Sequence, residues 1–196
     1  MFKLIAITNR RLCDTDLIGR IREIKEQGIE VILREKDISE ADYSALLKSA
    51  GSVTAHSFAG AAAENGIKRL HLPLYMLREN PQLADRFYAG ASVHSPEEAL
   101  EAKSLGAKYV IAGNVFETDC KKGLAGKGLQ YIRDVKTSVD IPVYAIGGIG
   151  INNIASVRGA GADGACIMSG FMKCEDVSKF VKEINDVLYR DRYRRY

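Results

Sequence analysis

The sequence predicts a single-domain α/β protein, a compact (β/α)8 barrel of the TIM type that spans residues 1–196. Two observations carry this prediction: eight short apolar runs of strand length recur along the chain, and segments with helical spacing lie between them. Eight alternations fit a closed parallel barrel, whereas a doubly wound sheet more often stops at five or six strands. At roughly 24 residues per unit the barrel is near the lower size limit of this fold, which leaves no room for an inserted domain.

The predicted strands are apolar on both faces, as parallel strands packed between helices and a barrel interior should be. In chain order they are FKLIAIT (2–8), IEVIL (29–33), GSVTA (51–55), KRLHL (68–72), FYAGASV (87–93), KYVIAG (108–113), IPVYAIGG (141–148) and DGACIMS (163–169). Between them, apolar residues recur three and four positions apart, for example at Leu17, Ile21 and Ile24. The last such segment, VSKFVKEINDVL (177–188), is predicted to be the helix that closes the fold.

Composition and charge predict a reduced, cytoplasmic protein that binds neither nucleic acid nor a membrane. The net charge of +3 comes largely from the tail YRDRYRRY (189–196), which we interpret as a solvated helix end or a homo-oligomer contact. The four cysteines form no CxxC pair, so they indicate neither a disulfide framework nor a zinc site. No segment has the roughly 18 apolar residues of a membrane span, and the N-terminus lacks the features of a signal peptide.

Glycines and a serine follow the last two predicted strands. In a barrel the active site is built from the loops after the strand C-termini, and phosphate is commonly held after strands seven and eight. Here AIGGIG places Gly147 and Gly148 after strand seven, and IMSG places Ser169 and Gly170 after strand eight. Each glycine alone also fits a tight turn, but the two loops together predict a phosphate site.

Two charged loops lie at the same predicted face. LREKD (33–37) presents Arg34, Glu35 and Lys36 after strand two, and FETDCKKG (116–123) adds a pair of lysines after strand six. An isolated loop of this kind would be a solvated one, but cations in both loops suit an anionic small molecule.

All three histidines fall near this face, at the ends of predicted strands three, four and five. No carboxylate or second histidine lies at a short ligand spacing, so His56, His71 and His94 do not predict a metal site. We interpret His94 as a helix-capping or loop histidine and leave the roles of His56 and His71 open.

Six segments together identify a family. They are LREKD, HLP, SVHSPEEALEAKSLGAKYV, GNVFETDCKKGLAGKGL, IPVYAIGGI and GADGACIMSG, in this order along the chain. On these segments the chain resembles the thiamine phosphate synthase and TenI superfamily of small (β/α)8 barrels. The resemblance implies a role in thiamine biosynthesis, in which the glycine and serine loops bind the phosphate of a thiazole phosphate or of thiamine phosphate.

One activity implied by the resemblance is thiamine phosphate synthesis, in which a pyrimidine diphosphate is joined to a thiazole phosphate with the help of Mg²⁺. By motif, the asparagine and aspartate that follow strand three in synthases fall on His56 and Ser57, and their aspartate after strand four falls near Met76. No metal cofactor is therefore expected unless synthase activity is retained with an altered metal site. The cationic positions of the motif are retained: Arg34, Lys36 and Lys121.

The segment FETDCKKGL is closest to the TenI branch, whose activity is the isomerisation of a thiazole carboxylate phosphate to its aromatic tautomer. In that reaction one group serves first as base and then as acid, and the branch uses a histidine where this chain has Asn114. An amide can hydrogen-bond the substrate but does not titrate near neutral pH. We therefore expect Cys120, His56 or Glu35 to carry the proton in place of the missing histidine.

The resemblance leaves three functions open. The first is a thiazole tautomerase, which is an isomerase, and the second is a thiamine phosphate synthase, which is a transferase. The third is a regulatory protein that binds thiamine-related phosphates without turning them over. In each of them, Thr118 and Lys121 are expected to line the pocket of a small phosphorylated ligand.

Overall fold

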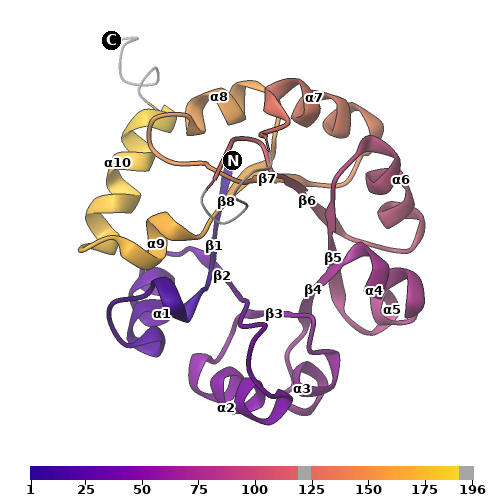
Figure 1. Cartoon of the computed structure of the whole chain (residues 1–196), viewed down its shortest axis with the longest axis vertical. Helices are drawn as coiled ribbons and strands as arrows, with labels where there is room; N and C mark the ends of the chain where they lie inside the picture. The colour runs from indigo at the N-terminus through magenta and orange to yellow at the C-terminus, as the bar shows by residue number, and fades with distance from the viewer. Residues whose placement is uncertain (119–124, 190–196) are drawn as a thin grey trace.

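The structure is a closed barrel of eight parallel strands surrounded by helices, which confirms the predicted fold class (Figure 1). It is a computed structural model that describes residues 1–118 and 125–189. The strands are β1 (Lys3–Ile7), β2 (Glu30–Leu33), β3 (Thr54–His56), β4 (Arg69–Pro73), β5 (Tyr88–Val93), β6 (Tyr109–Gly113), β7 (Val143–Ile146) and β8 (Gly164–Ile167). Each strand pairs with the next one in the chain, and β8 pairs with β1 to close the barrel.

Helices follow the strands around the outside of the barrel, as the sequence periodicity predicted (Figure 1). They are η1 (Arg10–Leu12, a 3₁₀ turn), α1 (Leu17–Glu26), α2 (Glu40–Ala50), α3 (Ala59–Glu64), α4 (Leu74–Glu79), α5 (Leu83–Arg86), α6 (Pro96–Ser104), α7 (Gly128–Ser138), α8 (Ile154–Gly159), α9 (Ser169–Lys173) and α10 (Val177–Tyr189). Side chains cap several of them: Asp16 accepts from the Gly19 N–H at α1, and Ser95 accepts from the Glu98 N–H at α6. Across residues 1–118 and 125–189, no helix is long and apolar enough to cross a membrane.

The last helix closes the molecule, as predicted. Its buried residues recur three and four positions apart, at Val177, Val181, Ile184 and Leu188. It packs against α8 and α1, so the C-terminal helix lies outside the junction of the last and first strands (Figure 1). We interpreted the tail 189–196 as a solvated helix end or a homo-oligomer contact; Tyr189 ends α10, and residues 190–196 lie outside the described residues.

Apolar side chains pack on both sides of the strands. The larger core lies between the strands and the helices, and a smaller one fills the barrel interior. Because side chains alternate across a strand, β1, β2, β6, β7 and β8 each supply apolar residues to both cores. The interior core consists of Ile5, Ile7, Ile32, Tyr109, Ile111, Tyr144 and Cys166.

The N-terminal ends of the strands are packed by a layer that we call the barrel floor, consisting of Tyr88, Tyr109, Tyr144, Glu30 and Arg69. The ring of Tyr109 lies between those of Tyr88 and Tyr144, with centroid distances of 6.0 and 5.4 Å. The Arg69 guanidinium lies over the Tyr88 ring, 4.4 Å from its centroid, and pairs with Glu30 at 3.2 Å. The three rings and the Arg69–Glu30 pair fill the end of the barrel opposite to the strand C-termini, where the active site is predicted.

Candidate functional site

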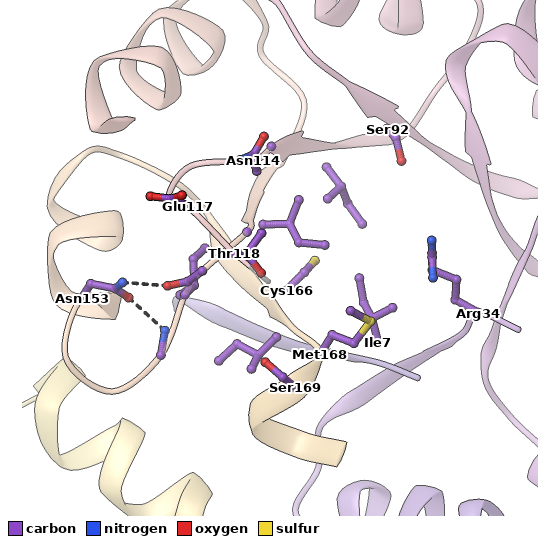
Figure 2. Close-up of a pocket in the computed structure, with 18 of the residues that line it drawn as sticks. Ile7, Arg34, Ser92, Asn114, Glu117, Thr118, Asn153, Cys166, Met168 and Ser169 are labelled. Atoms are coloured by element: carbon purple, nitrogen blue, oxygen red, sulfur yellow. Dashed lines mark hydrogen bonds between the residues drawn. The ribbon is translucent and has the colours of Figure 1, made fainter. Parts of the chain in front are cut away.

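A cavity of about 880 Å³ opens where the strands end (Figure 2). Each of the eight strands, or the loop that follows it, contributes to the lining. The volume is that of a site for a small organic ligand, and the position is the one at which barrel enzymes build their active sites.

The structure brings most of the predicted site residues together around this cavity. Glu35 and Gly170 do not line it, and Cys120 and Lys121 lie outside the described residues. The predicted residues that line it are Arg34, Lys36, His56, Asn114, Thr118, Gly147, Gly148 and Ser169.

Glu35 is held in a polar network between the loops that follow β1 and β2. The residue is 3% exposed, and its carboxylate accepts hydrogen bonds from the Thr8 hydroxyl at 2.7 Å and from the Arg10 backbone N–H at 3.1 Å. The same threonine oxygen accepts from the Arg34 backbone N–H at 2.9 Å. These contacts hold Glu35 between the two loops and outside the cavity lining, which disfavours the proton-carrying role that we considered for it.

The loop after β7 forms one corner of the cavity. Gly147 (φ +106°) and Gly148 (φ +62°) have left-handed backbone conformations that favour glycine. A Cβ atom at Gly147 would lie 2.5 Å from the Cβ of Asn114, so the loops after β6 and β7 are in direct contact here. Asn153 fastens the turn, because its Nδ2 donates to the Gly148 carbonyl at 2.8 Å and its Oδ1 accepts from the Gly150 N–H at 2.9 Å.

Two hydroxyl-bearing residues extend this corner. Ser169 is the first residue of α9, and Thr118 follows the end of β6. Gly170 lies beside Ser169 but faces the outer helices, since a Cβ atom there would be 2.6 Å from Cζ of Phe180 in α10. We call Gly147, Gly148 and Ser169 the glycine corner. Figure 2 shows Asn153 and Arg34 on opposite sides of the cavity, so the corner and the cationic loop face each other.

Two imidazoles line the side of the cavity formed by β3 and β4. The ring centroids of His56 and His71 are 5.6 Å apart. Nδ1 of His56 shares a hydrogen bond with the Ser57 hydroxyl at 2.7 Å, and Nε2 of His71 shares one with the Ser92 hydroxyl at 2.8 Å. The remaining ring nitrogen of His71, Nδ1, is buried and has no hydrogen-bond partner among the described residues.

Both imidazoles are held in the neutral form. Burial, assisted by His71 and by the charges of Arg34 and Lys36, lowers the pKa of His56 to about 2. Burial and the same two cations lower the pKa of His71 to about 3. A neutral imidazole with so low a pKa is a poor proton acceptor, which disfavours His56 as the substitute base.

The residues at this side do not fit a magnesium site. Mg²⁺ requires hard oxygen ligands, carboxylates above all. The described lining residues here offer imidazoles, hydroxyls and the cations Arg34 and Lys36, and their one carboxylate, Glu117, comes from the loop after β6. Within residues 1–118 and 125–189, no three His, Cys, Asp or Glu side chains form a group able to hold a metal ion.

His94 was predicted to lie near the active face as a helix-capping or loop histidine, with no role in the site. Its backbone N–H donates to the Glu98 carboxylate at 2.6 Å, which agrees with a residue near the start of a helix. Its ring, however, lines the cavity, and Nδ1 lies 2.9 Å from the carbonyl oxygen of Gly113, the residue before Asn114. The available signal was its position directly after a strand on the active face.

Known proteins resemble this chain over most of its length. Residues 4–171 match the TMP-TENI family, described as thiamine monophosphate synthase. A thiamine-phosphate synthase from Pyrococcus abyssi is 34% identical over 200 residues, which cover 95% of this chain and 94% of that protein. One from Clostridium acetobutylicum is 29% identical over 203 residues, which cover 97% and 96% of the two chains.

Two solved structures superpose on this chain. A thiamine phosphate pyrophosphorylase from Pyrococcus furiosus superposes with a TM-score of 0.82 at 32% identity, over 96% of both chains. A 3-hexulose-6-phosphate synthase superposes with a TM-score of 0.68 at 18% identity, a likeness of fold alone.

Proposed function

Because this chain belongs to the thiamine monophosphate synthase family, we propose that it forms thiamine phosphate from a pyrimidine diphosphate and a thiazole phosphate. The observation that carries the proposal is the arrangement of the cavity, in which a glycine corner faces a loop with two cations. Full-length relatives named thiamine-phosphate synthase support the assignment. The cytoplasm is the proposed place of this activity, as the cysteine pattern suggests.

In the proposed reaction, the glycine corner holds the thiazole phosphate through backbone N–H groups of Gly147, Gly148 and Ser169. Arg34 and Lys36 hold the diphosphate on the opposite side. The thiazole nitrogen then forms a bond to the methylene carbon of the pyrimidine as the carbon–oxygen bond to the diphosphate breaks, and pyrophosphate leaves with the electron pair. Arg34 and Lys36 also bring positive charge to the leaving pyrophosphate.

The test is to measure thiamine phosphate by chromatography after mixing the protein with both substrates, with Mg²⁺ and with a chelator. We expect product from the wild type and a 10- to 100-fold lower kcat/KM for Arg34→Gln, about the effect of losing one charged hydrogen-bonding partner. Arg86→Gln is the matched control, because Arg86 is exposed and lies outside the cavity. A folded wild type that binds thiazole phosphate yet makes no product would rule the proposal out.

A second candidate is isomerisation of a thiazole carboxylate phosphate, the TenI-type reaction. The observation that favours it is the side of β3 and β4, where His56, Ser57 and His71 stand and where a carboxylate set for magnesium is missing among the described residues. A tautomerisation releases no pyrophosphate and needs no such metal.

Calorimetric titration with thiazole phosphate also separates both enzymes from a regulatory binder, for which tight binding without any turnover is expected.

A further inference from the structure

The TenI-type reaction requires a group that takes up and returns one proton, and the residues first considered for it are poorly placed. Asn114 carries an amide, which does not titrate near neutral pH. The Glu35 carboxylate is buried among Thr8 and Arg10 and does not line the cavity. His56 is a weak proton acceptor in its buried position, and Cys120 lies outside the described residues.

His94 meets the requirements of such a group. Its Nδ1 is 2.9 Å from the Gly113 carbonyl oxygen, and a carbonyl can only accept a hydrogen bond. The neutral ring therefore carries its proton on Nδ1, which leaves the lone pair on Nε2. Among the described residues Nε2 has no hydrogen-bond partner, and the residue is exposed at the cavity, where ligand and solvent can reach it.

The backbone around His94 is held in place on both sides. Its N–H donates to the Glu98 carboxylate at 2.6 Å, and the Lys127 ammonium group donates to its carbonyl oxygen. With Nδ1 bound to Gly113, three contacts fix the residue against β6 and the start of α6. A proton-transfer group that is held this way needs little reorganisation when a ligand binds.

His94 is also connected to the glycine corner by a short series of contacts. Gly113, its hydrogen-bond acceptor, immediately precedes Asn114, and Asn114 packs directly against Gly147. A heterocycle anchored by its phosphate at the glycine corner would therefore lie beside Asn114 and within the part of the cavity that His94 lines. His94 and Asn114 therefore lie on the same side of the cavity as the glycine corner.

We propose that His94 contacts a phosphorylated heterocycle in this cavity and carries the proton of its isomerisation. Nε2 takes a proton from a ring carbon, the electron pair of that carbon–hydrogen bond moves into the conjugated ring system, and the imidazolium returns the proton to the exocyclic carbon. No oxidant or further reactant is needed. The inference rests on the second candidate function, the TenI-type reaction, and names its catalytic residue.

The test follows the isomerisation of thiazole carboxylate phosphate by NMR in D₂O, where one deuterium should enter the exocyclic position. His94→Asn places an amide near Nδ1, so it can keep the contact with Gly113 but has no proton acceptor. His94→Gln places the amide near Nε2 and serves as a second variant should the first be unstable. Glu97→Gln, on the exposed face of α6 and outside the cavity, is the control for changes to this region.

We expect the wild type and Glu97→Gln to accelerate the isomerisation, and both histidine variants to be at least about 100-fold slower. Their affinity for thiazole phosphate should stay within about threefold of the wild type, because binding depends on the glycine corner. A histidine variant that keeps the wild-type rate overturns the inference, and so does a wild type that does not isomerise the compound. The chromatographic assay of thiamine phosphate formation, made on the same preparations, tells whether the synthase proposal fails as well.

Discussion

At the scale of single residues, the contact between Gly147 and Asn114 determines the shape of the site. The loop after β7 can approach the loop after β6 this closely only because Gly147 has no side chain and has a φ of +106°. The same contact sets the distance between the proposed phosphate site and the residues at the end of β6. Gly147 thus links the proposed phosphate site at the glycine corner to the residues at the end of β6, where the reaction is proposed.

We expect Gly147→Ala to lower the free energy of unfolding by about 2 kcal/mol or more and to weaken binding of thiazole phosphate. The reasons are the left-handed backbone and the 2.5 Å approach of the new Cβ to Asn114. Gly150→Ala is the matched control for stability, since a Cβ atom there meets nothing within 4 Å and its backbone is not left-handed. Urea unfolding measures both variants, and equal midpoints would contradict the role given to this contact.

The sequence gives the site residues with uneven success, and Arg34, Glu35 and Lys36 show why. Their position after a strand was enough to predict a cationic loop on the active face, and Arg34 and Lys36 do line the cavity. The role of Glu35 depends on Thr8, which is 27 positions away in the sequence, so no local pattern could reveal it. The position of His94 on the active face was predicted, but it was given only a local role at a helix start, because its contact with Gly113, 19 positions away, is not visible in a local pattern.

At the scale of secondary-structure elements, α2 joins the ends of two strands through one buried side chain. The Tyr43 hydroxyl donates to the Leu33 carbonyl at 2.6 Å and accepts from the His56 N–H at 2.8 Å. Leu33 ends β2 and His56 ends β3, so the helix fixes the relative position of the cationic loop and the imidazole pair. Burial also raises the pKa of this phenol, which keeps it in the protonated form that donates.

We expect Tyr43→Phe to lower the free energy of unfolding by about 1–3 kcal/mol, because it leaves the buried His56 N–H without its acceptor. The ring is retained, so packing against Phe58 should not change. Tyr75→Phe is the control, since Tyr75 is exposed on α4. Denaturant midpoints of the two variants should differ clearly, and a Tyr43→Phe midpoint equal to that of the control would show that the two strand ends do not depend on this hydroxyl.

At the scale of the whole molecule, the barrel keeps two neutral imidazoles in its interior at the cost of acid stability. The pKa of His56 is lowered to about 2 and that of His71 to about 3, whereas an unfolded chain binds these protons near pH 6.5. Between these limits the unfolded state holds more protons than the folded state. The free energy of unfolding therefore falls as the pH is lowered from about 6.5, and it is fully retained above that value.

The expected slope is about 1.4 kcal/mol per pH unit for each of the two histidines below pH 6.5. Urea unfolding at pH 7, 6 and 5 measures it. His71→Gln removes one of the two titrating groups and can keep a hydrogen bond to Ser92, so its slope should be smaller by about 1.4 kcal/mol per pH unit. Identical slopes for the variant and the wild type would mean that His71 is protonated as easily in the folded protein as in the unfolded one.

The overall architecture was the most predictable level of description. Eight apolar runs and the spacing in segments such as VSKFVKEINDVL were enough for a closed barrel, because alternation and periodicity are properties of the chain itself. The way each end of the barrel is filled could not be predicted, since it depends on which side chains from distant strands meet inside. Tyr109 and Arg69, for example, come from strands β6 and β4.

The barrel floor has a consequence for substrate entry and product release. Three tyrosine rings and the Arg69–Glu30 pair fill the N-terminal end of the barrel. Among the described residues, the cavity is therefore closed at that end and opens only on the loop side. The product of the reaction must leave through the same opening by which the substrates entered. A bound product then blocks the binding of the next substrate. Slow product release would limit turnover even when the bond-making step is fast.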